Sequence, residues 1–163
     1  MFFIRPIEPQ DNPYIAKIIR EVSVEFGLAA DSGFAVGDTV VDHLFENYQQ
    51  EKSHYWVIVD QNNQVLGGGG IAPLAGAPDV LEIQKMYFLP QLRGQGFAKK
   101  ILTMAFEFAR FHAIETCYLE TTGSLMQAVE LYKKMGFKQL DAPLGDTGHS
   151  HACEIWMAKT IQL

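Results

Sequence analysis

The chain has 163 residues, with 13 Lys and Arg against 19 Asp and Glu and a formal net charge of -6. This length allows one globular domain, placed over residues 1–163, with a core large enough to need no disulfide or metal staple. The acidic balance argues against a nucleic-acid binder, which would present a basic face. Cys117 and Cys153 form no disulfide scaffold, and we expect both to be buried strand residues without a catalytic role.

The sequence contains no recognisable targeting or membrane signal. Arg5 and Pro6 end the apolar start of the chain before the core of an export signal can form. The longest uncharged run, residues 61–78, contains four consecutive glycines and two prolines, which makes it a poor membrane span. We therefore expect a cytoplasmic protein that contacts neither a membrane nor nucleic acid.

The first fifty residues are predicted to form a strand and two helices. Residues 2–7 have the character of a short strand. Asn12 is placed as the N-cap of a helix with a proline at its first position, and apolar residues recur at helical spacing until Gly27 ends it. The Gly- and Ala-rich residues 28–37 are predicted to be a loop, followed by a second helix from Asp38 to about Gln50.

Strands and helices alternate along the rest of the chain. Strands at 54–60 and 65–72 form a hairpin, and the glycines at 67–70 indicate a bulge or a neighbour packed against bare backbone. Further strands are predicted at 80–89, 115–121, 137–142 and 152–161, and helices at 94–112 and 124–135, the second with a capping box of Ser124 and Gln127. This alternation predicts one α/β or α+β domain around a mixed sheet.

A glycine-containing loop, Gln91-Leu92-Arg93-Gly94-Gln95-Gly96, joins a strand to the start of a helix. The glycines allow a tight turn, and the amides of the first helical turn favour an anion such as a diphosphate, beside the positive charge of Arg93. A Walker loop is excluded because no glycine is followed by the required Gly-Lys-Ser/Thr. A Rossmann fingerprint would need glycine or alanine where Lys99 stands.

Three motifs in order resemble the GNAT N-acetyltransferase superfamily. The Gln-x-x-Gly-x-Gly loop resembles its acetyl-CoA loop, residues 81–90 resemble its central strand, and residues 128–137 match its Ala-x-x-Leu-Tyr-x-x-x-Gly-Phe segment. The resemblance implies a single-domain α/β (α+β) GNAT-like fold, whose mixed, mostly antiparallel sheet is splayed at the cofactor site and flanked by helices. Many members have Asn where this chain has Leu125, and Ser124 or Gln127 are the candidates to replace its contact.

The resemblance also implies a reaction. An N-acetyltransferase of this type uses acetyl-CoA as cosubstrate and no metal, and moves the acetyl group to a primary amine of a small molecule or peptide. Both substrates would bind together, and the amine would attack the thioester directly. Family habit implies a homodimer. The alternatives are a non-catalytic acyl-CoA-binding or interaction module on the same fold, and a nucleotide-binding protein that uses the same glycine loop.

The resemblance assigns the cofactor to the central strand and the loop that follows it. Backbone groups of Met86 and Phe88 are expected to pair with the pantetheine arm as an added strand, and amides of residues 93–98 to hold the diphosphate. Otherwise, Met86 and Phe88 are ordinary core and Arg93 is a surface charge. The complete predicted set is Met86, Tyr87, Phe88, Gln91, Arg93, Gly94, Gln95, Gly96, Phe97, Ala98, Lys99 and Gln127.

Two residues are predicted to carry the proton transfers. Glu82 is the only acid in the 81–90 strand, and a partly desolvated carboxylate can accept a proton from an ammonium group. It is otherwise a solvent-facing glutamate or one that only orients the substrate. Tyr132 lies in the family's Leu-Tyr segment, where a phenol near the sulfur can protonate the leaving thiolate; otherwise it is a core tyrosine.

The chain also contains an alternating His149, His151 and Cys153. In a strand these residues would share one face, but neighbours on one strand diverge too much for three-point metal coordination, so a pocket or structural role is expected. Glu25, Tyr48 and His149 are candidates to line the acceptor pocket, because the family's first two helices and last loop flank it.

Overall fold

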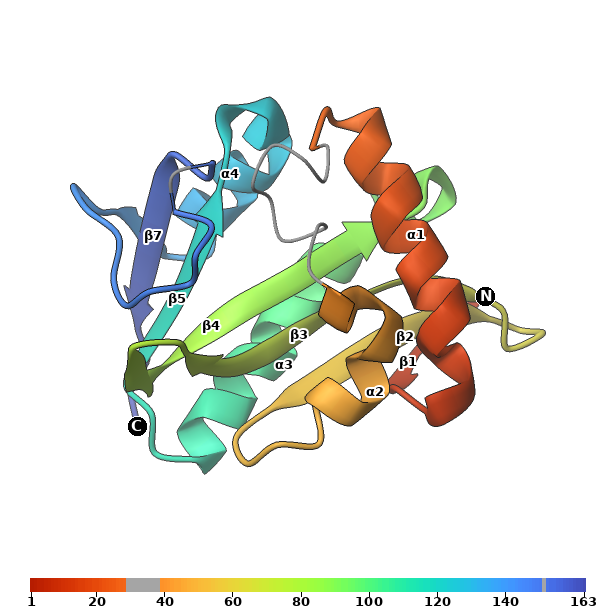
Figure 1. Ribbon diagram of the computed structural model, residues 1–163, viewed down its shortest axis with the longest axis horizontal. Helices are drawn as coiled ribbons and strands as arrows, with labels where there is room; N and C mark the ends of the chain where they lie inside the picture. The colour runs from red at the N-terminus through yellow and green to blue at the C-terminus, as the bar shows by residue number, and fades with distance from the viewer. Residues whose placement is uncertain (29–38, 151) are drawn as a thin grey trace.

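The computed structural model describes residues 1–28, 39–150 and 152–163, and its strands form one seven-stranded sheet (Figure 1). The order is β1-β2-β3-β4-β5-β7-β6, and every neighbouring pair is antiparallel except β4–β5. The strands are β1 (Phe2–Pro6), β2 (His54–Asp60), β3 (Val65–Leu74), β4 (Ala77–Phe88), β5 (Thr116–Thr121), β6 (Lys138–Gln139) and β7 (Ile155–Thr160). The predicted mixed, mostly antiparallel sheet is confirmed.

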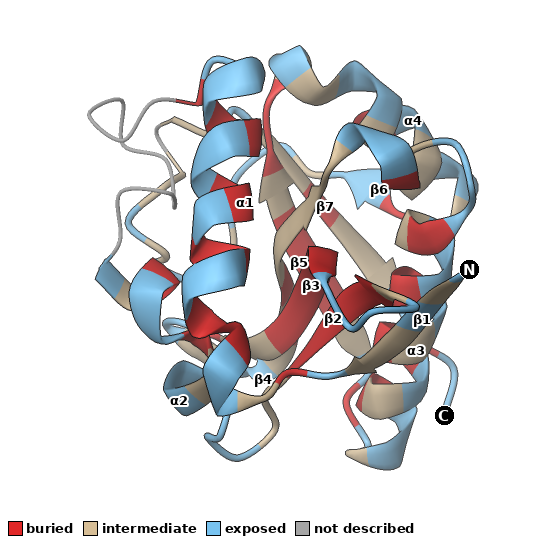
Figure 2. Ribbon diagram, turned by 90° about the vertical axis from the view of Figure 1, so that its right-hand side faces the viewer, coloured by how far each residue is buried: buried red, intermediate tan, exposed pale blue. Residues whose placement is uncertain are grey.

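Helices cover both faces of this sheet (Figure 2). They are α1 (Asn12–Glu25), α2 (Leu44–Asn47), α3 (Phe97–Phe111) and α4 (Met126–Lys134). On one face, Ile15 of α1 and Leu44 of α2 share a core with Tyr55 of β2. On the other face, Ile101 of α3 shares a core with Trp56, the next residue of β2. Because successive strand residues point to opposite faces, β2 belongs to both cores. None of the described helices is long and apolar enough to cross a membrane.

The glycines of β3 make room for aromatic rings and for a bulge. A Cβ on Gly68 would lie 2.6 Å from Cε1 of Tyr55, and one on Gly70 would lie 2.6 Å from Cδ2 of the same ring. The register against β4 shifts between these two glycines, so that β4 has one residue more than β3 over this stretch. Both predicted meanings of the glycine run, a bulge and a close neighbour, are confirmed.

The bulge changes which residues of β4 share a face. Lys85 lies at the bulge with a φ of 50°, and its carbonyl oxygen accepts the hydroxyl proton of Tyr55 at 2.7 Å. Before the bulge, Gln84 points to the side of α1 and α2. After it, Tyr87 packs on that same side, whereas Met86 and Phe88 pack into the core under α3. The extra residue therefore brings Tyr87 to the face that carries Gln84.

The pairing of β4 with β5 is short. Leu81 and Glu82 pair with Cys117 and Tyr118, and the register goes no further. Residues 83–88 continue beyond this point, and among the described residues no strand pairs with their β5-facing edge. Because a bulge bends its strand, β4 turns away from β5 and the sheet opens between them (Figure 1). The predicted splay is confirmed.

The predicted second helix is wrong in its extent. A 3-10 turn at Thr39–His43 comes first, and α2 contains only Leu44–Asn47. The helix is interrupted because His43 has a φ of -133° and a ψ of 40°, outside the helical region. Asp38 and residues 29–37 of the predicted loop lie outside the described residues.

The prediction that Asn12 is the N-cap of its own helix is wrong. Asp11 holds the N-cap position of α1, and the Asn12 side chain instead reaches α2. Its Oδ1 accepts the amide of Phe45 at 2.9 Å, and its Nδ2 donates to the Glu46 carboxylate at 2.9 Å. Asn12 thereby joins the start of α1 to the start of α2.

The capping box at Ser124 and Gln127 is also wrong. Residues 123–125 form a 3-10 turn, α4 begins at Met126, and Leu125 at its N-cap makes no side-chain cap bond. The Glu154 carboxylate supplies the missing acceptor from outside the helix: it accepts the Gly123 amide at 2.7 Å and the Thr122 hydroxyl at 3.0 Å. A distant carboxylate therefore replaces the predicted local cap.

Several element ends also differ from the prediction. The helix expected from residue 94 begins at Phe97, because Gly96 takes a left-handed φ of 81° at its N-cap. The strand predicted at 137–142 is reduced to Lys138–Gln139, followed by one further hydrogen bond from the Leu140 amide to the Trp156 carbonyl, and the strand predicted from residue 152 begins at Ile155.

We expect Gly70→Ala to destabilise the fold more than Gly69→Ala. A Cβ at residue 70 would lie 2.6 Å from the Tyr55 ring and 2.9 Å from that of Tyr48, both buried. At residue 69 the nearest atoms are side-chain carbons, of Ile101 at 3.0 Å and of the flexible Met86 at 3.3 Å. Because overpacking costs about 1–3 kcal/mol, G70A should lose about 2 kcal/mol of unfolding free energy and G69A less than about 1 kcal/mol. Urea unfolding measures both, and equal losses would contradict this packing.

Candidate active site

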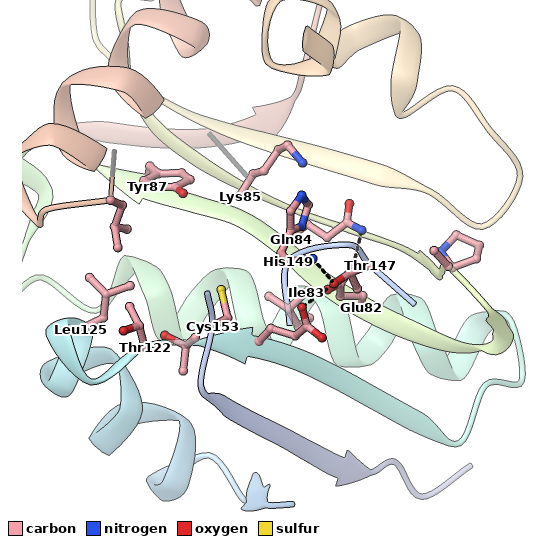
Figure 3. Close-up of a pocket in the computed structure, with 15 residues that line it drawn as sticks. Glu82, Ile83, Gln84, Lys85, Tyr87, Thr122, Leu125, Thr147, His149 and Cys153 are labelled. Carbon is pink, nitrogen blue, oxygen red and sulfur yellow. Dashed lines mark hydrogen bonds between the residues drawn. The ribbon is translucent and has the colours of Figure 1, made fainter. Parts of the chain in front are cut away.

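A cavity of about 240 Å³ lies beside the opening between β4 and β5 (Figure 3). Its walls come from β4, from the end of β3 and the β3–β4 turn, from the end of β5 and the turn after it, from Leu28 after α1, and from the segment that precedes β7. The polar and titratable residues that line it are Glu82, Gln84, Lys85, Tyr87, Glu120, Thr121, Thr122, Thr147, His149 and Cys153. The predicted residues Glu82, Tyr87 and His149 are thus brought together.

Glu82 has a defined hydrogen-bond environment. Gln84 Nε2 donates to Glu82 Oε1 at 2.7 Å, and the Tyr48 hydroxyl donates to Gln84 Oε1 at 2.6 Å. Because the amide oxygen of Gln84 holds the Tyr48 proton, its NH₂ group is directed at Glu82. Tyr48 therefore lies behind the site and is not among the residues that line the cavity.

The protein environment brings the pKa of Glu82 close to neutral pH. Burial raises the pKa of Glu82 to about 7, and the neighbouring charge of Glu120 adds to this increase. The hydrogen bond from Gln84 and the charges of Lys85 and His149 lower the same pKa. A carboxylate with this pKa is suited to accept a proton at physiological pH.

Tyr132 is a neighbour of the cavity-lining Tyr87 but is not itself among the cavity-lining residues. Its half-buried ring packs edge-on against Phe137 at a centroid distance of 5.9 Å. Burial, and secondarily the neighbouring Tyr87, raises the pKa of Tyr132 to about 12. Its hydroxyl group is therefore protonated at neutral pH and can donate a proton.

The glycine loop has the geometry of an anion site. Gly94 and Gly96 take left-handed φ values of 75° and 81°, and a Cβ at either position would have no atom within 4 Å. Glycine is therefore favoured at both positions by the left-handed backbone of the turn and not by close neighbours. The space beside the two glycines is open. The amide of Lys100 bonds to Gly96, so the amides of residues 97–99 have no partner within helix α3. Lys99 and Lys100 are exposed beside them.

Arg93 is held by its own protein instead of projecting from the loop. Its guanidinium donates to Glu25 Oε1 at 2.9 Å and to the Phe88 carbonyl at 3.0 Å, and lies 5.1 Å from the centre of the Phe26 ring. These contacts fasten the end of α1 to the loop. Glu25 consequently lies at the glycine loop and is not among the cavity-lining residues.

The remaining predicted cofactor residues follow the opening in the sheet. Met86 and Phe88 are half-buried with side chains in the α3 core, which leaves their backbone at the unpaired edge. The Phe97 side chain is buried against Phe2 at 5.9 Å, so only its backbone is available. Ala98 is half-buried. The two glutamines of the loop, Gln91 and Gln95, are exposed, as is Gln127 on the first turn of α4. An unpaired strand edge and helix amides together fit an extended ligand that ends in phosphates.

The His149, His151 and Cys153 pattern does not lie on one strand. β7 begins only at Ile155, and the amides of Ala152 and Cys153 both donate to the His149 carbonyl at 3.0 Å, which makes a turn. His151 lies outside the described residues, and no metal-binding group occurs among the described ones. Cys153 is therefore not the buried strand residue predicted from the sequence. It lines the cavity, and burial raises the pKa of its thiol to about 12.

Glu120 is a pocket residue that the sequence reasoning missed. Its carboxylate accepts three hydroxyl protons, from Tyr118 at 2.7 Å, Thr147 at 2.6 Å and Ser150 at 2.6 Å. The only signal in the sequence is an acid near the end of an apolar strand. Thr147 and Ser150 are far along the chain, so their contact with Glu120 was not predictable from local pattern.

The segment of residues 144–150, which we call the wall segment, also contacts the turn between β3 and β4. The Asp146 amide donates to the Ala75 carbonyl at 2.6 Å. Gly145 has a φ of 62°, and a Cβ there would overlap that carbonyl oxygen. The wall segment is thus held at both sides of the cavity, by the β3–β4 turn and by Glu120.

This chain belongs to the acetyltransferase (GNAT) family, whose model matches residues 23–137, and the protein is an N-acetyltransferase. It is 49% identical over 159 residues, 97% of this chain and 94% of the relative, to the uncharacterized N-acetyltransferase YjgM of Escherichia coli K12. An uncharacterized N-acetyltransferase of Schizosaccharomyces pombe is 26% identical, with 80% and 78% of the two chains covered. The crystal structure of a GNAT-family acetyltransferase from Staphylococcus aureus Mu50 has the same fold, with a TM-score of 0.82 at 16% identity, covering 99% of this chain and 100% of that one.

Gly145→Ala should displace the wall segment, and Gly148→Ala provides a matched control. Both glycines have positive φ, 62° and 78°, so alanine is strained at either position. Only at residue 145 would the new Cβ also overlap backbone, because residue 148 has no atom within 4 Å of that point. We expect faster amide hydrogen exchange at Asp146 in G145A than in G148A, and equal rates would contradict the contact with Ala75.

Glu82→Gln should remove a pH dependence of stability. The pKa of Glu82 is about 7 in the fold and 4.5 ordinarily, so the fold favours the protonated acid and loses stability as pH rises from about 4.5 to about 7. Between pH 5 and pH 8 the wild type should lose up to about 3 kcal/mol of unfolding free energy relative to E82Q. Urea unfolding at several pH values measures this difference, and parallel curves for the two proteins would contradict the raised pKa.

Proposed function

We propose that this N-acetyltransferase uses acetyl-CoA and transfers the acetyl group to a primary amine of a small molecule or peptide. The observation that carries the proposal is Glu82, a carboxylate with a pKa of about 7 in a cavity beside the opening of the sheet. An amine arrives as an ammonium ion and must lose a proton before it can attack, and Glu82 is suited to accept that proton directly or through water.

The cofactor region and the cavity adjoin each other in a way that supports this reaction. Tyr87 lines the cavity and lies in the part of β4 that pairs with β3 but not with β5, and the backbone of this part leads to the glycine loop. Acetyl-CoA, when bound, supplies an activated thioester. Amides of β4 near Met86 would hold the thioester carbonyl and stabilise negative charge on its oxygen. The loop amides at residues 97–99 and the exposed Lys99 would hold the phosphates.

Tyr132 is proposed as the general acid. Its phenol carries a proton at neutral pH, since its pKa, ordinarily 10, is raised by burial to about 12, and it neighbours Tyr87, which lines the cavity. When the amine displaces the thiolate, Tyr132 would donate its proton to the departing sulfur. Glu82 and Tyr132 thus divide the two proton transfers, one accepting and one donating.

Release of free CoA thiol, measured with acetyl-CoA and a panel of primary amines from pH 5.5 to 9, tests this assignment. Wild-type kcat should rise with pH through about 7 as Glu82 ionises. E82Q should lose this dependence and about 10²-fold in kcat. Tyr132→Phe should lower kcat while keeping the rise near pH 7, and the exposed, distant Glu115→Gln should behave as wild type. Calorimetric binding of acetyl-CoA without turnover on any amine would instead identify a non-catalytic CoA-binding module.

A further inference from the structure

Glu120 lines the same cavity as Glu82 but comes from the adjoining strand. Glu82 pairs with Tyr118 in the parallel register of β4 and β5, and Glu120 follows two residues later on the same face of β5. The two carboxylates therefore lie on the same side of the sheet, at the point where the two strands separate. The proposed proton transfers use only one of them.

The contacts of Glu120 connect β5 to the wall segment. Thr147 donates its hydroxyl proton to Oε1 at 2.6 Å, and Ser150 donates to Oε2 at 2.6 Å. Tyr118 also donates to Oε2, at 2.7 Å, and its own hydroxyl oxygen accepts the amide of Leu144 at 3.2 Å. A single carboxylate therefore holds both ends of the wall segment against the sheet.

This connection determines part of the cavity wall. Thr147 and His149 line the cavity, and the His149 amide donates to the Thr147 hydroxyl at 3.1 Å. The Thr147 hydroxyl thus donates to Glu120 and accepts the backbone amide of His149, so it links the two residues. Without the Glu120 carboxylate, the wall segment would keep its contact with the β3–β4 turn but lose the hydrogen bonds of Thr147 and Ser150 to β5. Its remaining contact with β5 would be the hydrogen bond from the Leu144 amide to the Tyr118 hydroxyl, which Glu120 no longer orients.

Charged and titratable groups surround Glu82 from every neighbouring element. Lys85 comes from β4, Tyr118 and Glu120 from β5, Tyr48 from the C-cap position just after α2, and His149 and Cys153 from the region before β7. Lys85 and His149 favour the ionised form of Glu82, whereas Glu120 is the nearby negative charge that opposes it. Replacement of Glu120 by a neutral side chain removes that opposition and leaves the other groups in place.

We propose that Glu120 is a positioning residue of the acceptor site: it fastens the wall segment to β5 and places a second negative charge beside Glu82. The proposal rests on the proposed function, in which Glu82 accepts a proton from the acceptor amine. Glu120 acts through Glu82 and through the wall segment, and its own oxygens are occupied by hydroxyl donors.

Glu120→Gln tests the charge with little change of shape. A ¹³C-detected pH titration of the glutamate carboxyls in the full-length protein follows Glu82 directly, with its signal assigned by its absence in E82Q. We expect the Glu82 midpoint to fall by about half a pH unit or more in E120Q. Glu115→Gln removes the same charge from an exposed position just before β5 and should leave the midpoint unchanged. A midpoint unchanged in E120Q, or equally lowered in E115Q, would overturn the proposal.

Amide hydrogen exchange tests the attachment of the wall segment. In Glu120→Ala, the amides of Leu144 and His149 should exchange at least about tenfold faster than in the wild type, because each depends on a hydroxyl that Glu120 holds. The double variant T147V/S150A removes two of the donors without altering β5, and it leaves the acceptor of the Leu144 amide, the Tyr118 hydroxyl, in place. It should accelerate exchange at Leu144 even if E120A does not fold, and unchanged exchange at Leu144 in the double variant would overturn the proposal.

The two hypotheses fail in different experiments. Neither the titration nor the exchange measurement needs an acceptor or turnover, so their outcome does not depend on finding the right amine. Absence of acetyl transfer to any amine, together with a lowered Glu82 midpoint in E120Q, would refute the proposed reaction alone. Normal acetyl transfer with an unchanged midpoint would refute the role of Glu120 alone.

Discussion

The buried hydroxyl of Tyr55 donates to the carbonyl oxygen of Lys85, and the candidate site depends on this hydrogen bond. It stabilises a bulge in which a non-glycine residue has a φ of 50°. Gly68 and Gly70 make the bond possible, because a Cβ on either would lie 2.6 Å from the Tyr55 ring. The bulge bends β4 away from β5, and the resulting opening leaves the β5-facing edge of β4 without a partner strand among the described residues, which is where we propose that the cofactor binds.

The same bulge concentrates polar chemistry on one face of the sheet. It places Tyr87 beside Gln84 on the α1 face, where desolvation and hydrogen bonding act on Glu82 in opposite directions. Desolvation is the larger effect and raises the pKa to about 7, while the amide of Gln84 moderates the increase. A glutamate with its ordinary pKa would be fully ionised at pH 7, but it would be a weaker proton acceptor than Glu82.

The net charge of the chain does not reflect the local charge at the glycine loop. The chain carries a net charge of -6, yet exposed lysines stand at the start of α3 beside unpaired helix amides. Arg93, the cation that the motif suggested for phosphate, is held by Glu25 and by the Phe88 carbonyl. Its role in the fold is to join α1 to the glycine loop, so the proposed phosphate contacts depend on the amides of residues 97–99 and on Lys99 instead.

The amino-acid sequence by itself determined the order of strands and helices, the glycine loop and the family, because these depend on local periodicity, turn chemistry and short motifs. It also singled out Glu82 and the close packing at the β3 glycines. Only the tertiary structure decided the face on which Tyr87 lies, since one extra residue at Lys85 reverses the alternation that a strand pattern assumes. The contact of Arg93 with Glu25, and those of Glu120 with Thr147 and Ser150, were likewise decided in three dimensions, because they join residues 68, 27 and 30 positions apart, beyond the range of local pattern.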